Sequence, residues 1–364
     1  MTRCWLVLAL VCAPLAARAA ETALAVPMHD GFALDAKIAS PDGAKDADVR
    51  RVIVLVHGSG AENMDEDLTA ASKDKVKNLV FHDLSDALVA KGFTVLRYHK
   101  RNYQCQLAIK ADPKFKDGPV IKALVADPYG TFVHDIRSML DFAAGRFPKA
   151  KLYLLGHSEG TYTALQAAHE RGGVAGVALI GFMLTTLDTL VVEQCVYRPL
   201  ALFDALDTDR DGTLSAQELA ASSPVAASLR AQLPVLDLDG NGKLERVEFM
   251  AGNFSNLLIN PISSPAAQVY AGTHPTAAAI LKEAAYPVCF FQGLWDNQTP
   301  AYNAKAVDLV NRQVWKKANL SFQYFEKLGH ALDPRDDYGD IAFRPMDRTA
   351  LAQVAARLAQ QFTE

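Results

Sequence analysis

The short sequence with the clearest chemical meaning is GHSEG, residues 156–160, which places Ser158 between two glycines. The apolar stretch KLYLL before it predicts a strand, and TYTALQAAH after it predicts a helix. A serine at such a turn needs small neighbours because the backbone bends tightly, and the helix directs N–H groups toward developing negative charge. The pattern predicts a nucleophilic Ser158. The alternative is a glycine-rich turn whose serine caps the helix.

A nucleophilic serine needs a base to remove its proton and a third group to hold that base. Downstream of Ser158 the chain has His169, His274 and His330. His169 lies on the helix directly after the serine, and His274 falls in a segment without alternating strands and helices. His330 follows the strand-like LSFQYF, where a loop can carry it over the edge of a sheet. We therefore expect His330 to be the base, against the alternative of a surface histidine.

The acid of such a triad should also end a strand and lie downstream of the serine. Asp296 meets both conditions, since it follows the apolar stretch PVCFFQGLW. The alternative is a turn-forming aspartate, in which case Asp333 or Asp308 would supply the acid.

The HGSG sequence at residues 57–60 ends an earlier apolar run, RVIVLV. A loop at that place can supply half of an oxyanion hole. We expect the backbone N–H of Ser59 to act together with that of Glu159, the residue after the nucleophile. His57 should hold the loop by hydrogen bonds, without serving as a second base.

Two twelve-residue segments, 207–218 and 237–248, have the spacing of calcium-binding loops. Such loops supply oxygens from positions 1, 3, 5, 7, 9 and 12, with glycine at position 6 for the bend. Gly212 and Gly242 occupy that position, and Leu214 and Leu244, at position 8, should join the loops through a short two-stranded contact. The expected ligands are Asp207, Asp209, Asp211, the Thr213 carbonyl and Glu218, and then Asp237, Asp239, Asn241, the Lys243 carbonyl and Glu248. Two structural Ca²⁺ sites are therefore predicted; the alternative is a pair of acidic, solvated turns.

Buried-strand patterns alternate with helical patterns over most of the chain, which predicts an α/β fold with a mostly parallel sheet covered on both faces. The strand-like segments are 51–60, 93–101, 150–160 (a strand that runs into a turn), 174–184, 286–296 and 320–330. Between about 188 and 285 the pattern is helical. We expect a core from residues 20–187 and 286–364, and a helical cap at 188–285 that holds the EF-hand pair at about 200–252.

The N-terminus has the pattern of a secretory signal peptide over residues 1–19: a basic start, a short apolar run and the small-x-small site Ala17-Arg18-Ala19. The alternative is an uncleaved anchor. Cleavage would leave a net charge of −6, which gives no reason to expect a nucleic-acid partner. No later stretch is long and apolar enough to span a membrane. Together with the signal-peptide pattern, this predicts a protein that is periplasmic or secreted.

Three cysteines remain after the leader. Cys289 lies in a predicted buried strand and should be a packed thiol, which leaves Cys105–Cys195 as the one disulfide to propose. Pairing and free thiols both remain open at this stage.

The chain resembles an α/β-hydrolase over residues 25–364, apart from the helical cap at 188–285, which is an insertion between two strands of the sheet. HGSGAENMDED is similar to the HGSGP-x-D-R-D-E of an esterase and peptidase-like branch, VLRYHKRN resembles its V-L-R-Y-D-K-R-G, and LLGHSEG resembles its nucleophile turn. The sequence departs from that branch at Ala61, Met64, His99 and Asn102. The two calcium loops resemble a paired EF-hand.

The expected function is that of a secreted serine hydrolase acting on small carboxylic esters. A peptidase acting on short peptides, or a thioesterase, is the alternative within the same fold. A non-catalytic calcium-binding protein on a hydrolase scaffold is the alternative from another class. Pocket shape decides the acyl and leaving groups, and the sequence determines neither them nor the oligomeric state.

Overall fold

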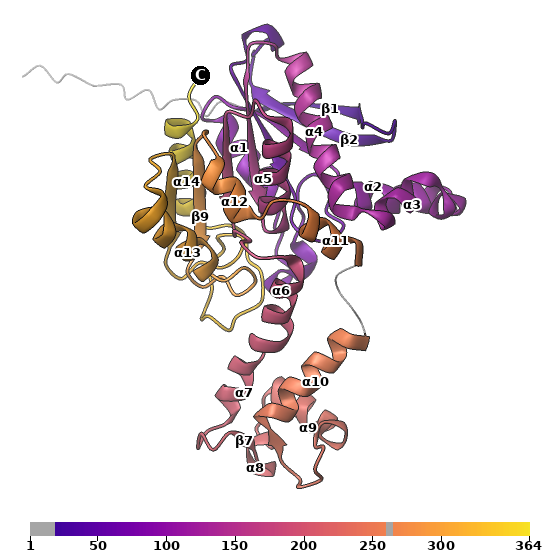
Figure 1. The fold of residues 1–364 in the computed structure, drawn as a ribbon, viewed down its shortest axis with the longest axis vertical. Helices are drawn as coiled ribbons and strands as arrows, with labels where there is room; N and C mark the ends of the chain where they lie inside the picture. The colour runs from indigo at the N-terminus through magenta and orange to yellow at the C-terminus, as the bar shows by residue number, and fades with distance from the viewer. Residues whose placement is uncertain (1–18, 260–264) are drawn as a thin grey trace, which may run out of the picture.

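The computed structural model describes residues 19–259 and 265–364. Its main sheet has eight strands in the order β1-β2-β4-β3-β5-β6-β9-β10 (Figure 1). The first two strands run antiparallel to their neighbours and the other pairs are parallel. The strands are β1 (Ala19–Pro27), β2 (Ala33–Pro41), β3 (Arg51–Val56), β4 (Thr94–Tyr98), β5 (Lys151–His157), β6 (Gly176–Ile180), β9 (Val288–Gly293) and β10 (Leu320–Phe325). The predicted fold class is confirmed.

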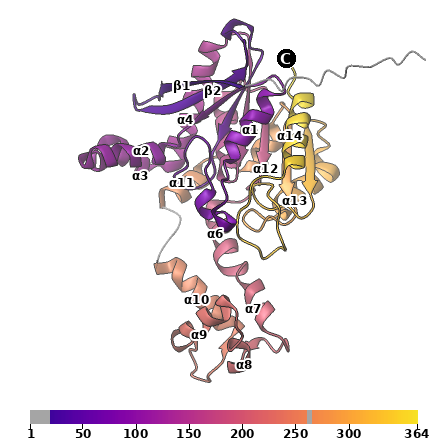
Figure 2. The ribbon, with the colours of Figure 1, turned by 180° about the vertical axis from the view of Figure 1, so that it is seen from behind.

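Helices cover both faces of this sheet because the central strands are apolar on both sides. In β3, Val52, Val54 and Val56 face one buried cluster, whereas Ile53 and Leu55 face the other. A fully buried aliphatic side chain of this kind contributes about 1.5–3 kcal/mol. The first face is covered by α4 (Pro128–Arg146), α5 (Glu159–Arg171) and α12 (Ala277–Glu283), and the second by α1 (Val80–Val89) and α14 (Arg348–Gln361) (Figures 1 and 2).

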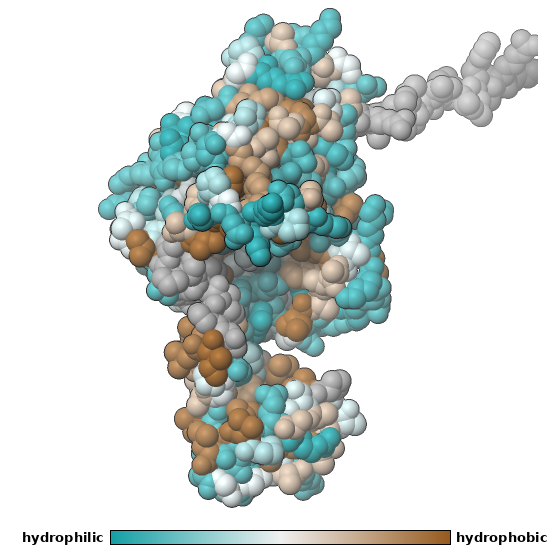
Figure 3. Space-filling model, turned by 90° about the vertical axis from the view of Figure 1, so that its right-hand side faces the viewer, coloured by the Kyte–Doolittle hydropathy of each residue, from teal (hydrophilic) through white to brown (hydrophobic). Residues whose placement is uncertain are grey.

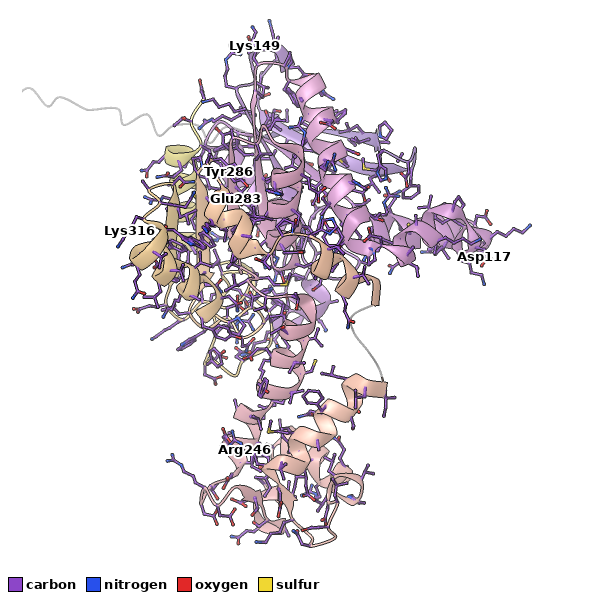
Figure 4. The ribbon with its side chains drawn as sticks, viewed as in Figure 1. Asp117, Lys149, Arg246, Glu283, Tyr286 and Lys316 are labelled. Carbon is purple, nitrogen blue, oxygen red and sulfur yellow. The ribbon has the colours of Figure 1, made fainter. Side chains whose placement is uncertain are left out.

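Several strands and helices outside the insertion were not predicted from sequence. The β1–β2 hairpin precedes the first predicted strand. α2 (Arg101–Ala111) and α3 (Pro119–Ala126) form an arm that extends from the body, with Asp117 near its tip (Figure 4). These two helices contribute few buried residues, so their sequences carry little of the apolar periodicity that signals a core helix. The predicted strand at 51–60 ends at Val56, because the next residues form the HGSG loop.

The insertion builds a separate lobe below the body (Figure 1). It leaves the sheet through α6 (Leu187–Val192), η5 (Glu193–Tyr197) and α7 (Leu200–Leu206), and continues with α8 (Ala216–Leu219), α9 (Pro224–Leu236), α10 (Arg246–Ile259) and α11 (Pro265–Thr273). A small apolar core holds the lobe together and consists of Phe203, Leu214, Leu219, Leu229, Leu244 and Phe249. Apolar surface is also visible on the outside of the lobe (Figure 3), where the exposed large hydrophobic residues include Val235, Leu238, Val247 and Leu258.

The chain rejoins the body before β9. Ile280 and Leu281 of α12 are buried in the same cluster as the sheet, and Glu283 and Tyr286 lie where this helix leads back to β9 (Figure 4). α12 therefore packs as part of the core, although it lies inside the segment predicted as the cap. α13 (Tyr302–Val310) then connects β9 to β10. Within the described residues, no helix has the length and apolar character that crossing a bilayer requires.

The predicted Cys105–Cys195 disulfide is not formed, and this expectation was wrong: both thiols are free, as is that of Cys289. Cys105 is buried on α2 beside Arg101, and this burial raises the pKa of its thiol to about 11. Cys195 lies on η5, near Arg198 at the start of the insertion. The two cysteines thus belong to different parts of the molecule. Cys289 is a packed thiol in β9, as expected.

The predicted leader, residues 1–19, lies outside the described residues except for Ala19, at which β1 begins.

Candidate active site

Ser158 occupies a strained turn between β5 and α5. Its backbone has φ 57° and ψ −125°, a conformation that side chains rarely adopt and that persists only where the surroundings enforce it. The two flanking glycines are required sterically. A Cβ on Gly156 would lie 2.3 Å from the Gly160 carbonyl oxygen, and one on Gly160 would lie 2.2 Å from the Val56 carbonyl oxygen. The GHSEG composition therefore follows from close backbone packing around the serine.

His330 and Asp296 form a buried pair at the same edge of the sheet. Nδ1 of His330 lies 3.0 Å from Oδ2 and 3.1 Å from Oδ1 of Asp296, and both side chains are almost completely buried. Burial by itself would raise the pKa of Asp296, but His330 and the N–H groups of Thr299 and Gln298 more than offset this and hold the pKa below its ordinary value. Asp296 is therefore a carboxylate that holds the imidazole by Nδ1.

Ser158 and His330 both lie beside the end of β6. The N–H of Ser158 donates to the carbonyl of Ile180 at 2.9 Å. The next residue, Gly181, has φ 61°, and a Cβ there would lie 3.0 Å from the His330 ring. In the described part of the chain, every side-chain hydrogen bond of His330 uses Nδ1. Nε2 is therefore the ring nitrogen left for the serine, and catalytic hydrogen bonds often tighten only when substrate binds.

The two alternative acids have other partners. Asp333 is buried in the loop after His330, where it accepts the N–H of Ala331 and pairs with Arg335. Asp308, on α13, pairs with Arg312. Asp333 therefore holds the loop that carries the histidine, while Asp296 is the carboxylate in contact with the ring.

The HGSG loop is held by side chains that the sequence reasoning missed. Glu66 Oε1 accepts the N–H of Gly58 at 3.2 Å and lies 2.8 Å from Nδ1 of His157. Burial disfavours the charged form of both groups. The interaction between them more than offsets this, because each group favours the charged form of the other, so the pKa of Glu66 is lowered and that of His157 is raised. On the opposite side of the loop, Lys100 Nζ donates to the carbonyl of Gly58 and to Glu159. The VLRYHKRN sequence was the signal that could have pointed to this lysine.

The two residues predicted to supply the oxyanion donors lie at the contacts of Lys100: Ser59 follows Gly58, whose carbonyl accepts from Lys100, and Glu159 accepts from Lys100 itself. Ser59 follows Gly58 on the loop and is exposed, and Glu159 is the first residue of α5 and is buried. His57 holds the loop, as Nε2 lies 3.0 Å from the carbonyl oxygen of Asn63. Burial lowers the pKa of His57 to about 3, so its ring is neutral.

The four departures from the resembled motifs lie in two contacting loops. His99 Nδ1 accepts the N–H of Met64 at 2.9 Å, so the residues that replace the usual Asp and Arg still meet. Asn102 Nδ2 donates to the carbonyl of Gly60 at 2.7 Å, directly before Ala61. The altered residues therefore preserve a connection between the HGSG loop and the segment after β4.

The two calcium loops have a geometry that suits a cation. The carboxylate oxygens of Asp207, Asp209 and Asp211 all lie within 4.8 Å of one another, as do those of Asp237, Asp239 and Glu248. Oxygens on opposite sides of a calcium ion, at 2.3–2.6 Å each, are about 5 Å apart. The described donor sets therefore fit Ca²⁺.

The loop backbones agree with this assignment. Gly212 and Gly242 have φ of 83° and 79°, and each donates its N–H to the first aspartate of its loop. β7 (Thr213–Leu214) and β8 (Leu244–Glu245) pair antiparallel, with Leu214 opposite Leu244, so the predicted contact is confirmed. Thr213 starts β7 and Lys243 directly precedes β8, which leaves their carbonyls beside this pair. Arg246 at the start of α10 (Figure 4) pairs with Asp204 on α7.

Glu218 and Glu248 hold their loops in the same way. Glu218 accepts the backbone N–H groups of Ser215 and Thr208, as Glu248 accepts those of Glu245 and Leu238, but Glu218 lies outside the first carboxylate triplet. These contacts, with that of Ser215 the largest, hold the pKa of Glu218 at about 2. Glu218 is therefore ionised at neutral pH.

Comparison with known proteins supports both parts of this architecture. A serine aminopeptidase (S33) family model matches residues 78–201, which include Ser158, and an EF-hand model matches residues 200–221. The solved structure of a puromycin-hydrolyzing peptidase of Mycobacterium tuberculosis aligns with a TM-score of 0.51 at 14% identity, covering 95% of this chain and 39% of that chain. Together with the strand order, these matches decide the fold. The chain has the α/β-hydrolase fold.

Two further proteins to which the chain is similar carry esterase names. Esterase EstD of Thermotoga maritima is 25% identical over 280 residues, or 77% of this chain and 54% of that protein. The chain thus spans about half the length of this curated relative. Est1E from Butyrivibrio proteoclasticus is 13% identical, with a TM-score of 0.49 and coverage of 94% of this chain and 99% of that chain.

A cavity of about 230 Å³ lies where the insertion meets the core. It lies between the start of the insertion and the loop after His330, and its lining residues are Arg198, Pro199, Ala201, Leu202, Tyr338, Gly339 and Ile341. Asn297, the neighbour of Asp296, connects the two walls: it accepts a hydrogen bond from Arg198 and donates to Tyr338 and Asp340. The cap and the core therefore border a mostly apolar space whose walls are joined by Asn297, the residue after Asp296.

Glu62, beside the HGSG loop, should give the stability of the protein a pH dependence. Burial, followed by the negative charge of Glu66, raises the pKa of Glu62 to about 7. The folded protein thus retains a proton that the unfolded chain releases from about pH 4.5 upward, so the free energy of unfolding falls as pH rises from there to about 7. We expect Glu62→Gln to remove this loss and to stabilise the protein more at pH 8 than at pH 5, by about 2 kcal/mol. Urea unfolding at the two pH values measures the difference, and equal stabilisation at both would contradict the assignment.

Proposed function

We propose that this chain is a serine hydrolase that cleaves small carboxylic esters. The observation that carries the proposal is the buried His330–Asp296 pair, joined through Nδ1, at the end of the sheet where the strained Ser158 also lies. A strained nucleophile beside an oriented base is the arrangement that activates a serine hydroxyl.

The reaction follows from this geometry. Oγ of Ser158 adds to the ester carbonyl carbon while Nε2 of His330 accepts its proton, and the carbonyl oxygen becomes an oxyanion held by the N–H groups of Ser59 and Glu159. Collapse of this intermediate breaks the bond to the alcohol, which leaves with the proton from His330. Water then hydrolyses the acyl-serine by the same two steps. Asp296 orients His330 and stabilises its charged form.

A peptidase is the second candidate, because the match to the serine aminopeptidase model spans the Ser158 segment. The cavity where the insertion meets the core suits an apolar group on either kind of substrate. A panel of nitrophenyl esters and aminoacyl nitroanilides separates the two. We expect kcat/KM to be higher for the esters, and the reverse order would assign a peptidase.

Covalent labelling tests whether the site is catalytic at all. A fluorophosphonate reacts only with an activated serine, so we expect one label per chain, on Ser158, as located by peptide mass spectrometry. Absence of labelling, together with calcium binding, would instead identify a non-catalytic calcium-binding protein on a hydrolase scaffold.

We further propose that the protein acts outside the cytoplasm. The support is the signal-peptide pattern of residues 1–19. Intact mass and N-terminal sequencing of exported protein should give a chain that starts at Ala20. A chain that retains Met1 after export would indicate an anchor.

We also propose that the EF-hand lobe binds two Ca²⁺ ions, which order the cap. The oxygens of loop 207–218 would hold one ion and those of loop 237–248 the other. Each bound ion would neutralise carboxylates that otherwise repel one another. None of the expected ligands belongs to the proposed triad. The ions should therefore act on stability and on the shape of the cap, and the bond-breaking step should proceed without them.

Calcium removal gives a measurable expectation. At ~1 mM calcium and a dissociation constant of ~0.1 mM, each independent site contributes about 1.4 kcal/mol. Chelation should lower the melting temperature by a few degrees, whereas fluorophosphonate labelling of Ser158 should persist. Glu218→Gln and Glu248→Gln should reproduce the effect of the chelator, while Glu283→Gln, at an exposed position on α12, serves as the matched control. No binding at 5 mM calcium by calorimetry, or complete loss of labelling in chelator, would contradict the structural role.

A further inference from the structure

The peptide unit between Gly58 and Ser59 is held at its carbonyl by a buried cation. Nζ of Lys100 lies 2.6 Å from the carbonyl oxygen of Gly58 and 2.7 Å from Oε2 of Glu159. The side chains of Lys100 and Glu159 are only 7% and 9% exposed, so little water competes for these contacts. The ammonium also lies 4.4 Å from the centre of the Phe132 ring, which faces it as a third partner.

Further hydrogen bonds hold the peptide units around Ser59. Asn102 Nδ2 donates to the carbonyl of Gly60. The N–H of Gly58 donates to Glu66, and the backbone N–H of Lys100 donates to the carbonyl of Glu62. The segment after β4 therefore contacts two carbonyls of the HGSG loop, those of Gly58 and Gly60, and that of Glu62 just beyond it, and Lys100 Nζ is the charged donor of this set.

The carbonyl that Lys100 holds belongs to the same peptide unit as the N–H of Ser59. A peptide unit is planar and trans, so its C=O and N–H point in opposite directions. Fixing the carbonyl of Gly58 on Lys100 thus directs the N–H of Ser59 to the other side of the loop. Hydrogen bonds from a charged donor are roughly twice as strong as neutral ones, which opposes rotation of this peptide.

We infer that Lys100 is a positioning residue for the oxyanion hole. It holds the peptide that supplies the N–H of Ser59, and through Glu159 it contacts the residue that supplies the second N–H. Lys100 thus sets the spacing of the two donors without touching the substrate. This inference rests on the proposed function, because it concerns the oxyanion of the same reaction. A merely structural role for the Lys100–Glu159 pair would affect folding stability alone.

A double variant separates the two roles. Lys100→Met removes the cation and leaves Glu159 as an unpaired buried carboxylate, which is expected to destabilise the fold. Lys100→Met/Glu159→Gln removes that unpaired charge while retaining the backbone N–H of residue 159. We expect the double variant to recover much of the melting temperature lost in Lys100→Met, and to remain slow.

The decisive readouts depend on the oxyanion. Loss of one oxyanion donor typically costs about 10²- to 10³-fold in kcat, so misplacing a donor should cost about 10- to 100-fold in the double variant, with KM nearly unchanged. Affinity for an aryl trifluoromethyl ketone should fall by a similar factor. In that complex Oγ of Ser158 bonds to the ketone carbon, the serine proton passes to His330 and the former carbonyl oxygen becomes the oxyanion.

A neighbouring ion pair supplies the matched control. Arg101, one residue after Lys100, forms a buried pair with Asp135 on α4, and within the described residues neither side chain hydrogen-bonds to the HGSG loop. Arg101→Met/Asp135→Asn should change stability and leave the ratio of ketone affinity to substrate KM within about twofold of wild type. If the Lys100 double variant behaves like this control, the positioning role is overturned. Failure of the proposed function is distinguishable, since wild-type protein would then neither bind the ketone nor lose activity on Ser158→Ala.

Discussion

Ser158→Ala should lower kcat for ester hydrolysis by about 10⁵- to 10⁶-fold, because the hydroxyl that forms the acyl intermediate is missing. His330→Ala should cost nearly as much, since Oγ then has no base. The double variant should be little slower than either single variant, because the members of a triad act as a unit. Initial rates with a nitrophenyl ester at saturating concentration measure all three.

Folding must be checked alongside these rates. Ser158 has strained backbone angles that alanine retains, and its side chain is small, so we expect circular dichroism and melting temperature to stay close to those of wild type. Retention of more than a few per cent of the activity by a folded Ser158→Ala protein would show that the nucleophile has been assigned wrongly.

Asp296→Asn should lower kcat by about 10³- to 10⁴-fold, the second largest effect. The carboxylate accepts from His330 Nδ1 and stabilises the imidazolium that forms during the reaction. An amide is neutral, and its NH₂ group can face Nδ1 and favour the unproductive tautomer. The loss should therefore appear mainly in kcat, with little change in KM.

Asp333→Asn is the matched control for this substitution. Asp333 is also a completely buried carboxylate, lies three residues after His330, and bonds to Ala331 and Arg335. Its replacement should lower the melting temperature and reduce kcat by less than about tenfold. If Asp333→Asn cost more activity than Asp296→Asn, then Asp333 would be the acid, and the role of Asp296 would be to hold the turn with Thr299.

Much of the site could be predicted from sequence because its constraints are local. GHSEG requires glycines on either side of Ser158, since Cβ atoms there would collide with the backbone of adjacent elements. The calcium loops require fixed intervals of oxygen-bearing residues, and the chain order of serine, acid and histidine restricts the choice to a few candidates. Buried parallel strands, likewise, leave continuous apolar runs in the sequence.

Tertiary structure decided the contacts between segments that are distant in sequence. Lys100 and Glu159 are 59 residues apart, and Glu66 and His157 are 91 apart, yet each pair is buried and in contact. Such pairs leave no periodic signature, because packing of the strands brings them together. The same reason explains the failed disulfide prediction: cysteine count and compartment favoured a bond, whereas the fold places Cys105 and Cys195 in different parts of the molecule.

The comparison of Asp296 with Asp333 also shows what the sequence predicts and what only the folded structure reveals. Both residues follow strands late in the chain, so the sequence favoured Asp296 but kept Asp333, with Asp308, as the alternative acid. The structure turns Asp333 toward the loop backbone and Arg335, and Asp296 toward Nδ1 of His330. The residue types and their order along the chain thus determined which chemistry is available, while the direction of each buried side chain was decided by the packing of the loops at the carboxyl ends of β9 and β10, where hydrogen bonds must be satisfied without water.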